Sequence, residues 1–194
     1  MIKKAPADYP LHELIQNRWS PRAFSQQPIS TDHLHILFEA ARWAPSSNNE
    51  QPWLFVYASK EEPAEFETIL HCLKESNQFW ARTAPVLVIT AAKTLFDQNG
   101  KPNRHAWYDV GQAISYLTLQ AMALGIYCHQ MGGFFPALAQ KTLNIPADYE
   151  PVTAIALGYP GDLVILSDEL RIRETAPRFR RKQTEFVFRG QYKK

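Results

Sequence analysis

A long segment that is apolar on nearly every side constrains the fold of this chain more than any other feature. The sequence predicts a helix from about His105 or Asp109 to Leu124, ended by Gly125. A helix that is apolar around most of its surface is buried. In a chain of 194 residues, burial partly by a second subunit explains such a helix. One face of this helix would consist of Val110, Ala113, Ile114, Leu117, Ala121 and Leu124. Much of the remaining surface is apolar too, at Tyr116, Leu119, Met122 and Ala123.

The rest of the chain alternates between helical and extended patterns. Apolar spacing predicts helices at residues 8–17, 31–43, 63–73 and 136–143, the first capped by Asp8 and the second by Ser30 or Thr31. Strands are expected at 54–58, 86–91, 126–129 and 152–158, with a strand-like end at 186–188. The strand at 86–91 is almost wholly apolar, so we expect both of its faces to be covered. Residues 1–194 fit one domain, with a mobile loop at 93–104.

Composition excludes several classes of function. A formal charge of +2 is too small to favour a nucleic-acid or membrane partner. Cys72 and Cys128 form neither a CxxC pair nor a zinc-type spacing, so a disulfide framework is not expected and a reducing cytoplasm fits. The start of the chain has no apolar core of a signal peptide, and no apolar run approaches the roughly 20 residues of a membrane helix.

A polar loop lies between the predicted helix at 31–43 and the strand at 54–58. Residues 44–53 offer two hydroxyls, three amides and two prolines. Because prolines fix the backbone, the remaining N–H groups point where the turn directs them. Such a loop suits a planar ligand with polar edges. On residue types alone, an ordinary polar turn with helix-capping serines is the simpler interpretation.

Two arginines and a serine stand close together upstream, in the segment 18–24. Guanidinium groups match phosphate oxygens bidentately, so Arg18 and Arg22 with Ser20 between them can hold a phosphate. A solvated surface pair is the alternative for the arginines.

These two segments together resemble the nitroreductase family of FMN-dependent oxidoreductases. The family has an Arg-x-Ser-x-Arg element followed by a Pro-Ser-Ser-x-Asn-x-Gln-Pro-Trp loop, and both occur here in that order. Three further segments match it, and the resemblance runs from about Leu11 to the C-terminus. The further segments are Gln130-Met131-Gly132-Gly133-Phe134, Ala156-Leu157-Gly158-Tyr159-Pro160 and Arg180-Arg181-Lys182.

The resemblance implies a single α+β domain of the nitroreductase fold, with a central mixed or antiparallel sheet flanked by helices. It also implies a homodimer with FMN at the subunit interface. One subunit would hold the phosphate and ribityl chain through Arg18, Trp19, Ser20 and Arg22, with Arg181, which best fits the family's basic position, and Arg180 beside it as a further candidate. Gln183 stands where family members often have proline, so the register of this basic run could shift by one. The partner subunit would contribute Pro45, Ser46, Ser47, Asn49 and Gln51.

The same resemblance assigns residues to the flavin ring. Asn77 would touch the ring, and a backbone N–H near Gly132 would face the flavin N5, with Met131 and Gly133 beside it. A turn asparagine and a tight glycine turn are the alternatives that the residues themselves allow. Trp107, Tyr108, Phe134 and Phe135 are candidates to wall a substrate site, although core aromatics are the more conservative interpretation.

No side-chain catalytic constellation is present in the sequence. There is no GxGxxG after a strand, no Walker A loop, no GxSxG and no HExxH. Difficult chemistry would then come from a cofactor, which agrees with a flavin enzyme. The resemblance implies ping-pong transfer of hydride from NADH or NADPH through flavin N5 to a small-molecule acceptor, a nitroaromatic or quinone, without a metal.

Two alternatives remain open. One keeps the fold but is a flavin-binding, flavin-storing or flavin-consuming relative without reductase activity. The other is a nucleic-acid-binding module on the basic run 171–182, which lacks the interleaved aromatics of a stacking platform.

Overall fold

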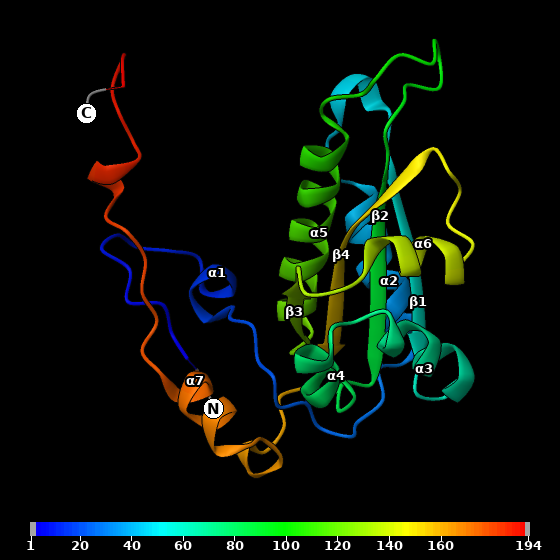
Figure 1. Cartoon of the computed structure of the whole chain (residues 1–194). Coiled ribbons are helices and arrows are strands. Elements are labelled where there is room, and N and C mark those ends of the chain that lie inside the picture. Colours follow the sequence, from blue (N-terminus) through cyan, green and yellow to red (C-terminus); the bar gives the residue numbers. More distant parts are fainter. Residues whose placement is uncertain (1–2, 193–194) are drawn as a thin grey trace.

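The computed structural model describes residues 3–192 and is built around a four-stranded sheet (Figure 1). The strand order is β1-β2-β4-β3, and every neighbouring pair is antiparallel. The predicted central sheet is therefore confirmed, and it is antiparallel rather than mixed. The strands are β1 Trp53–Ser59, β2 Val86–Lys93, β3 Tyr127–Met131 and β4 Tyr149–Gly158.

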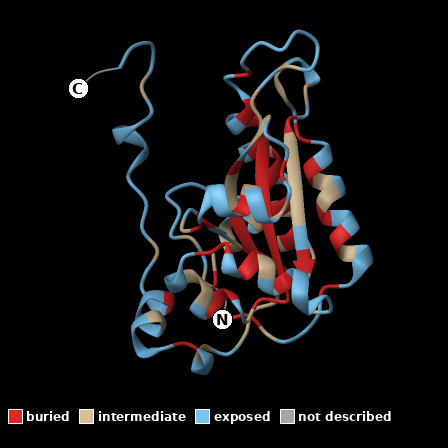
Figure 2. Cartoon of the chain, turned by 45° about the vertical axis from the view of Figure 1, so that its right-hand side comes forward, coloured by how far each residue is buried: buried red, intermediate tan, exposed pale blue. Residues whose placement is uncertain are grey.

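Helices cover both faces of this sheet. On one face lie α2 Thr31–Arg42 and α5 Ala106–Ala123, and on the other lie α3 Pro63–His71, α4 Glu75–Ala81 and α6 Pro136–Thr142. Alternate residues of β2 enter the two cores: Val86 and Val88 face α2 and α5, whereas Leu87 and Ile89 face the opposite layer. All four are buried, which confirms that the apolar strand is covered on both sides. Figure 2 shows the buried residues concentrated in these layers.

The long apolar helix occurs where the sequence predicts it. Six apolar residues of α5 are buried, and Gly125 follows its end with a φ of 72°. The outward side of α5 still carries large aromatic side chains: Trp107 is 46% exposed, Tyr108 67% and Tyr116 44%. Burial of this side by a second subunit stays a prediction.

A third part of the chain lies beside the sheet and its covering helices. We call it the terminal layer: it comprises residues 3–17 with α1 Glu13–Asn17, and residues 163–192 with α7 Asp168–Thr175 (Figure 1). Three short 3₁₀ turns complete the described elements, at Ser47–Asn49, Leu163–Ile165 and Gln183–Glu185. Most residues after α7 are exposed, and Phe179 is 78% exposed.

Two element predictions are wrong. The first helix begins at Glu13, capped by His12, and not at Asp8, because Pro10 pushes the residue before it out of the helical region. Residues 186–188 form no strand, since in the described part of the chain no strand lies alongside to complete a ladder. The helices α4 and α7 were not expected from the apolar pattern. The mobility of residues 93–104 stays a prediction.

Both cysteines are buried and carry free thiols. Burial raises the pKa of the Cys128 thiol to about 12, and burial also raises the pKa of the Cys72 thiol. Among residues 3–192, no helix is long and apolar enough to cross a membrane. The same residues contain no group of three or more His, Cys, Asp or Glu side chains placed to hold a metal ion.

Candidate functional site

The arginine segment 18–23 runs beside β3 and is fastened there by His129. The Nδ1 of His129 lies 2.9 Å from the carbonyl oxygen of Pro21, and because a carbonyl can only accept, the proton sits on Nδ1. The imidazole packs on Trp80, with ring centroids 4.4 Å apart. Burial lowers the pKa of His129 to about 4, so this ring is neutral near pH 7. His129 is therefore a packed residue with a defined bond to the arginine segment.

The charges of three arginines, Arg18, Arg178 and Arg180, interact near the start of this segment. Arg18 is half-buried, and its Nη1 donates to the Oγ of Ser20 at 3.2 Å. Burial, and then the nearby charges of Arg178 and Arg180, lower the pKa of Arg18. Within residues 3–192, no carboxylate forms a salt bridge with any of these three arginines. Like charges gathered without a counter-ion indicate a site for an anion.

Arg178 is the structural anchor of this corner. Its Nη1 donates to the carbonyl oxygens of Lys3 at 2.8 Å and Gln16 at 3.1 Å, which ties the C-terminal segment to the N-terminal one. Arg181, by contrast, lies over the ring of Phe186, 5.7 Å from its centroid, and is not among the charges that shift Arg18. The charge of Arg180 thus reaches Arg18, whereas the guanidinium of Arg181 packs on Phe186.

Arg22 differs from Arg18 because it has a carboxylate partner. Its Nη1 lies 3.1 Å from the Oε2 of Glu174 in α7, and the Glu174 side chain is fully buried. The carboxylate also accepts from the backbone N–H of Arg22 at 2.6 Å. Part of the Arg22 charge is therefore already balanced within the chain.

The turn after β3 presents backbone to solvent. Gly132 is exposed, and a Cβ added there would meet nothing within 4 Å. The carbonyl of Gly133 accepts from the Nδ2 of Asn77 at 2.9 Å and from the N–H of Lys74 at 3.0 Å. A Cβ at Gly133 would lie 2.5 Å from that Nδ2, so Gly133 leaves room for the Asn77 amide. These two hydrogen bonds tie the start of α4 to the turn that follows β3.

The serine–asparagine loop has an unusual backbone. Asn48, Asn49 and Gln51 have φ values of 54°, 57° and 52°, in the left-handed region that side-chain-bearing residues seldom adopt. Such strain persists only where surrounding contacts enforce it, and it concentrates at functional positions. The Oγ of Ser46 accepts from the N–H of Gln51 at 3.0 Å, and the N–H of Ser47 donates to Asp109 at 3.0 Å.

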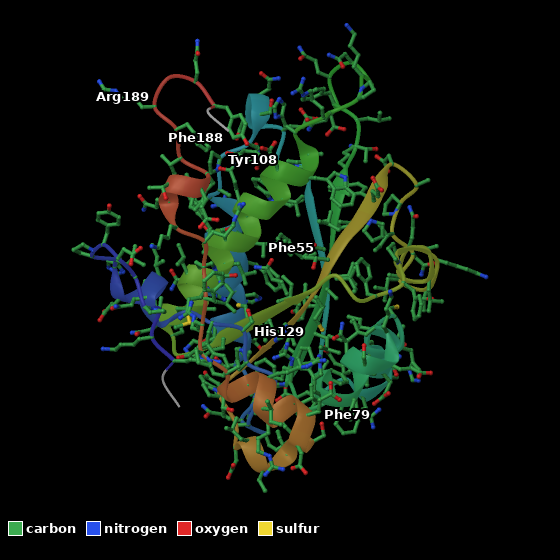
Figure 3. All side chains as sticks on the ribbon, turned by 60° about the vertical axis from the view of Figure 1, so that its left-hand side comes forward. Phe55, Phe79, Tyr108, His129, Phe188 and Arg189 are labelled. Carbon is green, nitrogen blue, oxygen red and sulfur yellow. The ribbon has the colours of Figure 1, made fainter. Side chains whose placement is uncertain are left out.

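This loop and the arginine segment lie at opposite ends of α5. Asp109, which holds the loop, is in the first turn of α5, whereas Asn17 lines a hollow of about 430 Å³ with Met122 in the last turn. Thirteen residues at about 1.5 Å each separate Asp109 from Met122 by about 20 Å. Figure 3 shows the same division, with His129 well below Tyr108. A single chain does not bring the two segments together.

A model of the nitroreductase family matches residues 15–73 and 58–159, which is more than half of the chain. The chain belongs to the nitroreductase family. A candidate NADH dehydrogenase/NAD(P)H nitroreductase of Ralstonia nicotianae is 30% identical over 142 residues, covering 64% of this chain and 72% of that protein.

Solved structures agree with the nitroreductase assignment. A crystal structure described as an oxidoreductase containing FMN is 36% identical, with a TM-score of 0.91, and covers 96% of this chain and 95% of that one. An FMN-dependent nitroreductase from Clostridium difficile is 18% identical with a TM-score of 0.70, covering 92% and 98%, and shows the shared fold alone. The α+β nitroreductase fold predicted from the sequence is confirmed.

The family's predicted site residues fall into two groups in this structure. The first group consists of residues that a single chain gathers near β3. Two of its members, Trp19 and Met131, have side chains that are buried in the core. The loop residues form the second group at the far end of α5. The first group is Arg18, Trp19, Ser20, Arg22, Asn77, Met131, Gly132, Gly133 and Arg180, and the second is Pro45, Ser46, Ser47, Asn49 and Gln51.

Four residues around the site were missed by sequence reasoning: Asp109, His129 as a backbone anchor, Glu174 and Arg178. Arg178 could have been found, since it stands two residues from Arg180 and alternate residues of an extended segment share a side. Glu174 gave no signal, because a glutamate among charged residues is typical of a solvated helix.

Proposed function

We propose that this chain is an NAD(P)H-dependent oxidoreductase that binds FMN and reduces a nitroaromatic or quinone acceptor. The observation that carries the proposal is the corner formed by Arg18, Arg178 and Arg180, which has three guanidiniums and no bridging carboxylate in the described chain. Support comes also from the 36% identical oxidoreductase containing FMN and from the relatives named for NAD(P)H nitroreductase activity.

The residues of this corner fit a phosphate monoester. Arg18 and Arg180 offer charged donors, and Ser20, bonded to Arg18, offers a hydroxyl beside them. Arg22 adds a further guanidinium whose charge is shared with Glu174. We therefore assign the phosphate to Arg18, Ser20 and Arg180, with Arg22 and Arg178 holding the surrounding backbone and tail.

The turn after β3 fits the edge of a flat heteroaromatic ring. The open space at Gly132 lets a ring approach the backbone, and the Asn77 amide, bonded to Gly133, stands beside that approach. We assign the ring edge to the backbone of Gly132 and Gly133 and to Asn77.

We propose that the rest of the site comes from a second copy of the chain. The strained loop 45–51 lies about 20 Å along α5 from the arginine segment, too far to close over the same ring within one chain. A homodimer that pairs one copy's loop with the other's arginines completes the site. Exposed aromatics on α5 and the terminal layer, including Tyr116 and Phe179, provide apolar surface for pairing.

FMN supplies the hydride chemistry that no side-chain constellation in the sequence provides. The chain's own groups would bind and orient: the guanidiniums fix the phosphate, and the backbone at Gly132 fixes the ring edge. We expect NAD(P)H and the acceptor to use the same open face in turn, which gives ping-pong kinetics. Trp107, Tyr108 and Phe135 are exposed and can wall that face, whereas Phe134 is buried and belongs to the core.

We place the enzyme in the cytoplasm, where both free thiols would stay reduced and NAD(P)H is available. The absorbance spectrum of the purified protein, before and after NADPH is added without oxygen, tests the proposed function. A flavin band that bleaches with NADPH and returns when a quinone is added is expected. A colourless protein that takes up no added FMN would refute the proposal. A coloured protein that neither NADPH nor NADH bleaches would instead be a flavin-binding or flavin-storing protein.

A further inference from the structure

Helix α7 has an inverted burial pattern. Its single buried residue is the acidic Glu174, 1% exposed, whereas Ile172 in the same helix is 71% exposed. A helix that merely docked on the domain would bury its apolar side. Burying a carboxylate is unfavourable unless hydrogen bonds satisfy it. Leu170, one turn earlier in α7, is partly buried against the core, but apolar packing does not explain a buried carboxylate at Glu174, whereas its hydrogen bonds do.

The Glu174 carboxylate grips the backbone of the arginine segment. Oε1 accepts from the N–H of Arg22 at 2.6 Å and lies 3.5 Å from the N–H of Ala23, and Oε2 accepts from the Nη1 of Arg22 at 3.1 Å. The opposite end of the same peptide group, the Pro21 carbonyl, accepts from His129 at 2.9 Å. One peptide group is thus held at both ends, by α7 and by β3.

This double hold fixes the direction in which Arg18 and Ser20 point. Pro21 already locks its own φ and restricts Ser20 before it. With the peptide after Pro21 also held, the segment has no freely rotating peptide between Ser20 and Arg22. A pre-organised binding segment loses less entropy when it binds, so its affinity is higher than that of a loose one.

We propose that Glu174 is a positioning residue for the phosphate-binding segment, acting through the peptide between Pro21 and Arg22. The inference rests on the proposed binding of FMN. Glu174 itself touches no ligand in this scheme. Its role is to aim Arg18 and Ser20 at the phosphate, and His129 supports it from the other side of the peptide.

Electrostatics and positioning predict opposite effects when the Glu174 charge is removed. Glu174→Gln frees the Arg22 guanidinium from its partner, so charge alone would make an anion bind more tightly. Positioning predicts weaker binding, because the amide is a poorer acceptor for two N–H groups and turns an NH₂ group toward Arg22. The sign of the change in FMN affinity therefore decides between them.

The experiment compares FMN with riboflavin, which lacks the phosphate, by fluorescence titration of flavin-free protein. For Glu174→Gln we expect the Kd for FMN to rise about tenfold or more, and the Kd for riboflavin to change less than about twofold. Glu174→Asp keeps the charge on a shorter side chain and should fall between wild type and Glu174→Gln. Glu169→Gln, on the exposed side of the same helix where Glu169 pairs with Arg173 at 2.8 Å, should change neither constant.

Three results would overturn the inference. Tighter FMN binding in Glu174→Gln would assign the residue a purely electrostatic role. Equal losses for FMN and riboflavin would assign it a general structural role, and Glu174→Asp gives the same comparison if the glutamine variant does not fold. An unchanged Kd for FMN would show that Glu174 has no role in FMN binding. Each presupposes wild-type protein that binds FMN; wild type that binds neither flavin would refute the proposed function itself, together with this inference.

Discussion

The sheet with its covering helices and the terminal layer depend to different degrees on apolar burial and on hydrogen bonds. In the sheet region, large side chains such as Leu117, Ile89 and Ile155 are fully buried, and burial of each contributes about 1.5–3 kcal/mol. In the terminal layer, Leu163, Leu166 and Leu170 pack on the core, and the remaining attachments are directional bonds. These bonds run from Glu174, Arg178 and Lys3 to backbone atoms. Each such bond contributes about 0.5–1.5 kcal/mol net. The sheet region should therefore set the stability of the domain, while the terminal layer sets the geometry of the phosphate corner.

The largest expected effect comes from a cavity in the sheet region. Leu117→Ala, at a position with 0% exposure in α5, should lower the free energy of unfolding by about 2–5 kcal/mol. Urea denaturation followed by circular dichroism measures it. Leu138→Ala in α6, where the side chain is 43% exposed, is the matched control and should cost much less. Equal losses would contradict the view that the buried α5 face dominates stability.

The next effect is a pH dependence of stability that comes from His129, which lies in β3 and contacts the arginine segment. The folded-state pKa of His129 is about 4, below the ordinary 6.5, because burial disfavours the charged ring. Between about pH 4 and pH 6.5, the unfolded chain therefore binds more protons than the folded chain. Stability from this residue is complete above about pH 6.5 and declines toward pH 4, by up to roughly 3 kcal/mol. Urea midpoints across this range should fall less steeply in His129→Asn, and an identical slope would exclude His129 as the cause.

A smaller effect is expected when Arg18, in the phosphate corner, is compared with Arg181, further along the C-terminal segment. Arg18→Ala should raise the Kd for FMN about tenfold to a hundredfold, because a charge-assisted hydrogen bond is worth about 1.5–3 kcal/mol. Arg181→Ala should have a weaker effect, since Arg181 lies over Phe186 and not at Arg18. Fluorescence titration with FMN measures both. An equal or greater loss in Arg181→Ala would move the phosphate toward Arg181.

The smallest effect tests how the terminal layer is attached. The Nζ of Lys3 donates to the backbone carbonyl of Glu174 at 2.6 Å. Lys3→Met keeps much of the side-chain length and should cost about 0.5–1.5 kcal/mol in local stability of α7. Amide hydrogen exchange should show faster opening of α7 with unchanged protection in β2. Faster exchange in β2 as well would mean that the two regions unfold as one unit.

How far the sequence predicted the fold depends on the strength of its apolar pattern. Helix α5 and strand β2 were predicted closely because long apolar repeats leave few alternatives. Helix α4 was not, because its large apolar residues Phe79 and Trp80 are adjacent and give no helical repeat. Helix α7 was not, because the residue it buries is a glutamate, which reverses the usual pattern.

The candidate site was likewise predicted only in part from the sequence. The motifs located each segment, but not which segments meet, because that depends on the folded path of the chain. Arg180 and Arg181 show the limit most clearly: neighbouring residues of an extended segment point to opposite sides, so a shift of one position exchanges which of them faces Arg18. The opposite ends of α5 that hold Ser47 and Arg18 could not be assigned before the fold was known.

The length of α5 has a consequence for inheritance. If each catalytic pocket combines the loop of one copy with the arginines of another, two differently damaged genes can rescue each other. A chain defective at Arg18 and a chain defective at Ser47 would, when produced in the same cell, form mixed pairs containing one pocket with no defect. Selection for reductase activity would then act on the residues that pair the two copies as well as on the residues that form the pocket.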